Sequence, residues 1–150
     1  MNELQKKQLA LLKDTIAYYS ADTTKRCMIN TSTCRYLGES LDKPHSDGCA
    51  VGRLLTPELR LQFDRMFPDK TVHYKPLFNL LPQEVQAYGV DFLGDLQNLH
   101  DFSSYWDENG LSKDGLIRKD VIMSKYKLVE EFEIPKEVID STEITFIKKD

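Results

Sequence analysis

CRYLGESLDKPHSDGCAVGRLL, residues 34–55, is the stretch around which we expect the fold to be arranged. It holds two of the three cysteines, one of the three histidines and three of the seven glycines. It ends in Gly48-Cys49-Ala50-Val51-Gly52, the only run of small residues in the chain. Small residues let the backbone approach a neighbouring helix, a turn or a ligand closely. We therefore expect the two ends of the stretch to fold together, with Cys34 and Cys49 packed in the core as thiols.

Helices are expected on both sides of this stretch. Asn2 to about Ser20 has apolar residues at helical spacing, and Asn2 with Gln5 forms an approximate capping box. Further helices are expected from Thr56-Pro57, from Pro82 to Gly89, over Asp91–Trp106, and from Ser112 to about Lys127. The sequence therefore predicts a mainly α fold.

The end of the chain has a different pattern. In the last helix, Ile117, Val121 and Leu128 are predicted to form the buried side. Polar and apolar residues then alternate at 131–134 and 143–146, which is typical of short strands. We expect a single compact helical domain over residues 1–127, and a small C-terminal β element, an arm or hairpin, over residues 128–150.

The composition is typical of a soluble globular protein. The chain has 150 residues, of which 41% are hydrophobic and 29% charged, and no apolar run approaches the ~18 residues of a membrane span. The polar N-terminus does not resemble a signal peptide, and three cysteines favour reduced thiols in the cytoplasm. Residues 1–75 carry 12 Lys/Arg against 9 Asp/Glu, and residues 76–150 carry 8 against 15. The basic residues do not form the dense stripe that is typical of a nucleic-acid binder, so we expect no nucleic-acid partner. Because no apolar run is long enough to span a membrane, we expect no membrane partner either.

A thiolate nucleophile is one catalytic candidate. A short helix is expected over residues 49–55, and a cysteine in its first turn would have a lowered pKa because the backbone N–H groups there favour the thiolate. His100 follows as a candidate base, with Asp101, Asp107 and Asn109 as alternative residues to orient it. The alternative is a buried Cys49 packed among apolar neighbours, which is the commonest environment of a free cysteine.

A zinc site is a second candidate. Cys27, Cys34, His45 and Cys49 are ligands of the right kind for tetrahedral zinc. Structural zinc sites usually have a ligand pair two to four residues apart, and only His45 and Cys49 come near that spacing. We therefore expect no metal and no cofactor.

The adjacent residues His100 and Asp101 are a third candidate site. Within LQNLHD it resembles the central motif of the HD-domain metal phosphohydrolases, which are also helical. That resemblance implies an earlier histidine and a later aspartate, for which His73 and Asp120 are available. The alternative is a histidine at the edge of the core, hydrogen-bonded to a neighbour.

Anion binding is a fourth possibility. Arg35 and Arg53 lie near the two ends of the central stretch, and the amides around Gly48 and Ala50 would open toward a phosphate if a helix began there. The Gly-Lys-Ser/Thr ending of a phosphate loop is missing. These four residues are the predicted ligand-binding set.

Several motifs together resemble a group of small uncharacterised proteins from bacteriophages and prophages. They are Cys34-Arg-Tyr, Gly48-Cys-Ala-Val-Gly-Arg, Leu81-Pro, the segment Phe92–Asp101, and Tyr105–Ser112. The likeness covers about residues 15–125 and implies a phage source and the bacterial cytoplasm, but no activity.

We therefore predict a non-enzymatic accessory protein that binds a host protein or a small signalling or anionic ligand. Its functional face would combine residues 34–55 with the His100 helix. The alternative is a small hydrolase using Cys49 with His100, or a metal-dependent phosphohydrolase using His100 with Asp101. A structural phage component is third. The acidic C-terminal arm would pack on the net-positive N-terminal half, and we favour its doing so across a homodimer.

Overall fold

The computed structural model describes residues 1–22, 49–68 and 70–128. Several expectations lie outside these residues. They concern the packing of Cys34 against Cys49, the remaining zinc candidates Cys27 and His45, the anion candidates Arg35 and Gly48, and the strands at 131–134 and 143–146.

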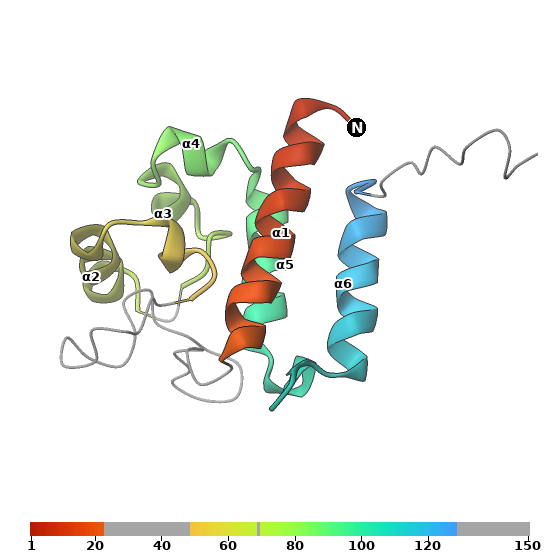
Figure 1. Cartoon of the computed structure of the whole chain (residues 1–150). Helices are drawn as coiled ribbons and strands as arrows, with labels where there is room; N and C mark the ends of the chain where they lie inside the picture. Colours follow the sequence, from red (N-terminus) through yellow and green to blue (C-terminus); the bar gives the residue numbers. More distant parts are fainter. Residues whose placement is uncertain (23–48, 69, 129–150) are drawn as a thin grey trace, which may run out of the picture.

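Three long helices form one side of the described structure. They are α1 (Glu3–Ala21), α5 (Val90–Asp101) and α6 (Lys113–Lys125). In Figure 1, α1 lies in front of α5, and α6 runs beside them in the opposite direction. Two glutamines of α1 link it to its neighbours, because Gln5 Nε2 donates to Tyr126 O at 3.3 Å and Gln8 Nε2 donates to Tyr88 O at 2.9 Å.

Short helices pack on the other side of α5 (Figure 1). They are η2 (Gly52–Leu54), α2 (Pro57–Met66), α3 (Lys75–Asn79) and α4 (Gln83–Gln86). Between the two groups lies an apolar core that draws on nearly every element. Its most buried large side chains include Leu12, Tyr19, Phe63, Leu77, Phe92, Leu93, Leu96, Leu99 and Ile122.

Three predicted helix starts, at Asn2, Thr56 and Ser112, are confirmed. Asn2 and Gln5 form a reciprocal capping box at α1, with both hydrogen bonds at 2.8 Å. Thr56 Oγ1 accepts from Leu59 N at α2, and Ser112 Oγ accepts from Gly115 N at α6. Each cap satisfies a backbone N–H that the first helical turn leaves without a partner.

The helix expected over residues 91–106 is shorter than predicted. It ends at Asp101, because Phe102 is extended, and a short 3-10 turn η3 (Ser103–Tyr105) follows. Trp106–Asp107 (β1) then pairs antiparallel with Gly110–Leu111 (β2), closing the turn expected at 107–110. The Trp106 indole donates to Leu99 O at 2.8 Å, so this hairpin is bonded to the last turn of α5.

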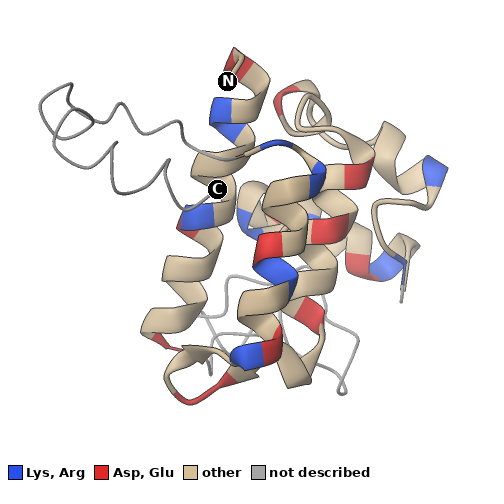
Figure 2. Ribbon diagram, turned by 90° about the vertical axis from the view of Figure 1, so that its right-hand side faces the viewer, with Lys and Arg blue, Asp and Glu red and all other residues tan. Residues whose placement is uncertain are grey.

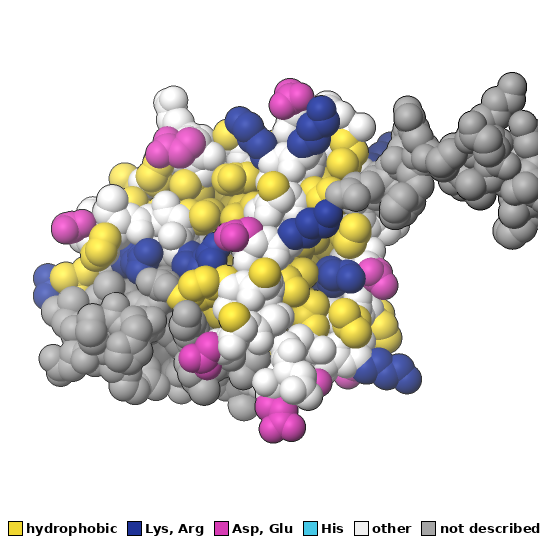
Figure 3. All heavy atoms as spheres, in the orientation of Figure 1, with side chains coloured by type: hydrophobic (Ala, Val, Ile, Leu, Met, Phe, Trp, Pro, Cys, Tyr) yellow, Lys and Arg dark blue, Asp and Glu magenta, His cyan; other side chains and the backbone are white. Residues whose placement is uncertain are grey.

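The predicted buried face of α6 is wrong for two of its three residues. Ile117 and Val121 are 55% and 47% exposed, whereas Leu128 is buried as expected. The buried residues of the helix are Gly115 and Ile122. Figure 3 shows hydrophobic side chains between Lys and Arg side chains on the viewer-facing surface of the region where α6 lies.

The prediction of a mainly α fold with a small β element is confirmed. In the described part of the chain, no helix has the length and apolar character that a membrane span requires. Basic and acidic residues are interspersed on the helices that face the viewer in Figure 2.

Candidate functional site

Cys49 lies in the core, before the 3-10 turn η2 rather than inside a helix. The helix expected over residues 49–55 is therefore limited to Gly52–Leu54. Cys49 is 2% exposed, and its Sγ accepts from Gly52 N at 3.2 Å. Gln97 Nε2 lies 3.9 Å from the same sulfur. Burial, and to a lesser extent the charge of Asp101, raise the pKa of the Cys49 thiol to about 12.

His100 and Asp101 form a pair at the end of α5. His100 is fully buried, and its Nδ1 lies 2.8 Å from Asp101 Oδ1. The Tyr19 ring meets the imidazole edge to face, with ring centroids 4.6 Å apart. Burial raises the pKa of Tyr19 above its usual range, and the nearby Cys49 adds to that shift.

The three predicted catalytic residues thus share one neighbourhood around Tyr19, but two of them are inaccessible. The expected lowering of the Cys49 pKa is not found, because burial disfavours the thiolate more than the Gly52 N–H favours it. The arrangement supports a neutral, packed thiol, while Asp101 keeps some contact with solvent.

We expect Cys49 to be almost unreactive in the folded protein. In a Cys27→Ser/Cys34→Ser variant, native labelling by a thiol reagent at pH 8 should be at least about a hundredfold slower than labelling in denaturant, since so little thiolate is present. Labelling is followed by mass spectrometry, with circular dichroism as the control for folding. Equal labelling rates in the native and the denatured protein would contradict the buried, neutral state of the Cys49 thiol.

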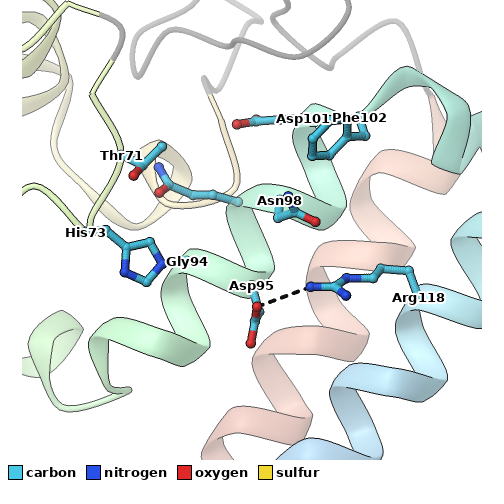
Figure 4. A pocket seen from close by; sticks show the side chains of 9 residues that line it. Thr71, His73, Gly94, Asp95, Asn98, Asp101, Phe102 and Arg118 are labelled. Carbon is cyan, nitrogen blue, oxygen red and sulfur yellow. Dashed lines mark hydrogen bonds and ion pairs between the residues drawn. The ribbon is translucent and has the colours of Figure 1, made fainter.

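A polar pocket opens on the face of α5 that carries Gly94, Asn98 and Asp101. We call it the α5 pocket; its volume is about 300 Å³. Figure 4 shows Asn98 near its middle, Asp101 and Phe102 at one end, and His73 and Arg118 on opposite sides. The full lining is Thr71, His73, Gly94, Asp95, Gln97, Asn98, Asp101, Phe102 and Arg118.

The segment 71–73 is held against α5 by two features of the helix. Gln97 Oε1 accepts from Val72 N at 3.0 Å, and both residues are buried. Gly94 leaves room for the His73 ring, since a Cβ at Gly94 would lie 2.1 Å from His73 Nε2. A glycine inside a helix is unfavourable by about 0.5–1 kcal/mol relative to alanine. Here it brings an imidazole to the edge of the pocket.

The opposite wall is a charged network between α5 and α6. Asp95 accepts from Arg118 at 3.3 Å, from Lys125 at 2.9 Å and from Tyr126 Oη at 2.5 Å. Burial alone would raise the pKa of Asp95, but the bonds from Lys125 and Tyr126 and the nearby positive charges lower it overall.

The set offered for metal phosphohydrolase chemistry does not come together. His73 lies in the α5 pocket, whereas Asp120 is on α6, with its side chain 73% exposed and 3.6 Å from Lys119. Among the described residues, no group of three or more His, Cys, Asp or Glu is arranged to hold a metal ion.

Two members of the predicted anion-binding set lie in the described structure. Ala50 is fully buried, and the backbone there does not begin a helix. Arg53 forms an ion pair with Asp14 and lies over the Tyr18 ring at 4.3 Å. Its charge is therefore engaged within the chain, and neither residue lines the α5 pocket.

Seven of the nine pocket residues were not identified as site residues from the sequence, namely Thr71, Gly94, Asp95, Gln97, Asn98, Phe102 and Arg118. Two signals pointed toward them. Gly94 interrupts a strong helix without ending it, and residues 94, 98 and 101 follow the spacing of one helical face. Arg118 has no such signal, because its place in the pocket depends on how α6 packs.

Comparison of this chain with family models, with curated proteins and with solved structures finds no match. The geometry of the α5 pocket is therefore the basis for a proposed function.

Proposed function

We propose that this chain is a non-catalytic binding protein that takes a small polar ligand into the α5 pocket. The observation that carries the proposal is the convergence of polar side chains from segment 71–73, α5 and α6 on one hollow. Its volume of about 300 Å³ is at the lower end of the range of ligand pockets. That size suits a metabolite rather than a polymer.

The charges of the pocket favour a ligand with hydrogen-bond donors. Asp95 and Asp101 supply two carboxylates and Arg118 one guanidinium, and Asp95 is also paired with Lys125, which lies outside the lining. In the described structure, Asp101 is therefore the lining carboxylate that is not paired with a Lys or Arg side chain. The Arg118 charge is shared with Asp95. This site therefore differs from the anion site expected near Arg53, and it favours a neutral or cationic molecule.

The biological setting in this proposal comes from the resemblance to phage and prophage proteins. It would place the protein in the bacterial cytoplasm as a phage accessory factor that sequesters a small molecule. A host-protein partner, a structural role in the phage particle, and a homodimer formed through residues 128–150 stay predictions.

The hydrolase alternatives have less support from the geometry. Cys49 is a neutral buried thiol, and His100 is enclosed by the core. A nucleophile needs thiolate character and access to substrate. Asp101 alone among the three predicted catalytic residues lines the α5 pocket, where it can act as a hydrogen-bond acceptor.

We expect Asn98→Trp to abolish ligand binding, because Asn98 lies near the middle of the pocket and an indole would fill it. The protein is dialysed against a protein-free small-molecule fraction of a bacterial extract, and retained compounds are identified by mass spectrometry. Ser124→Trp is the matched control, since Ser124 is exposed on α6 and lies outside the pocket lining.

The expected result is a compound retained by wild type and by Ser124→Trp, and lost in a folded Asn98→Trp variant. Retention of nothing by wild type would contradict the proposal. So would a compound that Asn98→Trp retains equally well, because its site would then be elsewhere.

A further inference from the structure

We infer that the α5 pocket takes a planar nitrogen heterocycle with a guanine-type edge, in which a ring N–H stands beside an amino group. This inference rests on the proposed function and names the class of ligand. It is carried by three features of the pocket: an open carboxylate and an exposed aromatic ring at one end, and an amide near the middle.

The first feature is the half-used carboxylate of Asp101. Among the described residues, Asp101 receives a hydrogen bond on Oδ1 alone, from His100 Nδ1 at 2.8 Å. The buried imidazole fixes the carboxylate, while the Asp101 side chain remains 14% exposed toward the pocket. An ionised carboxylate only accepts hydrogen bonds, so its ligand partner must be a donor. Each carboxylate oxygen has two lone-pair sites, so Oδ2 and the second site of Oδ1 can accept from two adjacent N–H groups.

The second feature is a set of polar side chains without a partner in the described structure. Thr71, His73 and Asn98 line the pocket, and none of their side chains is hydrogen-bonded to a described residue. Asn98 offers both a donor and an acceptor. A heterocycle with N–H groups on one edge and ring nitrogen or carbonyl acceptors on another matches such a mixed set.

The third feature is Phe102, which follows Asp101 directly. Its side chain is 39% exposed, large for an aromatic residue, and its ring contacts Tyr105 at a centroid distance of 5.6 Å. In Figure 4 the Phe102 ring lies at the pocket end that also holds Asp101. A flat base gains affinity by stacking on such a ring, whereas an aliphatic polar molecule does not.

The charged residues of the pocket favour a free base or a nucleoside over a nucleotide, which carries a phosphate group. The guanidinium of Arg118 is already paired with Asp95, and Lys125, the other cation beside Asp95, is not part of the lining. A phosphate group placed at the Asp101 end would be repelled by a carboxylate that has no Lys or Arg partner in the described structure.

The test titrates guanosine, inosine, adenosine, guanosine monophosphate and inorganic phosphate into the full-length protein, followed by amide chemical shifts. Guanosine should shift residues 71–73 and 98–102 and bind at least about tenfold more tightly than adenosine, which lacks the ring N–H. Inosine, which keeps the ring N–H but lacks the amino group, should fall between them. The monophosphate should bind more weakly than guanosine, and phosphate should cause no shift in the pocket.

Two variants test the assigned contacts. Asp101→Asn should weaken guanosine binding about tenfold or more, with Asp120→Asn as the matched control on the exposed face of α6. Phe102→Leu should weaken binding of all the nucleosides by a similar factor without changing the melting temperature. This second variant tests the site even if Asp101→Asn does not fold. Equal binding of guanosine and adenosine, or shifts outside the pocket, would overturn the inference.

The two proposals fail differently. If no nucleoside binds but the extract supplies another compound that Asn98→Trp loses, the ligand class is wrong and the binding function stands. If neither the nucleosides nor the extract supplies a ligand for the pocket, both proposals are wrong.

Discussion

Replacing Gly115 with alanine is expected to lower the free energy of unfolding by about 2 kcal/mol, a typical penalty for overpacking. A Cβ at this position would lie 2.0 Å from Tyr105 O and 2.9 Å from Leu111 Cδ2. Tyr105 O already accepts from Ser112 N at 2.8 Å, so the backbone cannot yield without straining that bond. The gain in helix propensity from alanine, about 1 kcal/mol, offsets only part of the clash. Urea unfolding followed by circular dichroism measures the change.

Gly94→Ala is the matched control, because it makes the same substitution inside the neighbouring long helix. There the clashing group is the far end of the His73 side chain, which is exposed and can rotate away. We expect Gly94→Ala to keep or slightly raise stability while it displaces His73 from the pocket. Equal losses in the two variants would contradict this difference between a backbone and a side-chain neighbour.

Asp95→Asn is expected to have the second largest effect on stability, with a loss of about 1–2 kcal/mol at neutral pH. The substitution leaves Lys125, Arg118 and Tyr126 without their shared carboxylate, and so weakens the link between α5 and α6. Lys125 is half exposed, so solvent screening limits its share of the effect. Thermal unfolding of the variant and of Asp120→Asn, an exposed aspartate on α6, gives the comparison.

The effect of Asp95 should depend on pH in a defined direction. Its pKa in the folded protein lies below the ordinary value of 3.8, so its stabilising contribution is complete above that value. The contribution is lost as the pH falls through the folded-state pKa. The gap between wild type and Asp95→Asn should therefore be constant near neutrality and shrink on acidification. A gap that widens in acid would contradict the assignment.

The candidate site could be predicted from the sequence only in part. His100 and Asp101 were identified as a pair because they are adjacent, and their contact at 2.8 Å needs no long-range packing. His100 and Asp101 differ in their exposure to solvent, and this difference could not be predicted. His100 is enclosed by Tyr19 from α1, while Asp101 faces the pocket beside segment 71–73.

The sequence by itself determined the starts of three helices, because Asn2, Thr56 and Ser112 bond to N–H groups three residues away in the same chain. It could not determine which face of α6 is buried. Helical periodicity and the large apolar residues favoured Ile117 and Val121, yet α6 packs through Gly115 and Ile122. Only the tertiary structure decided this, because the absence of a side chain at Gly115 matters only once the Tyr105 carbonyl lies against it.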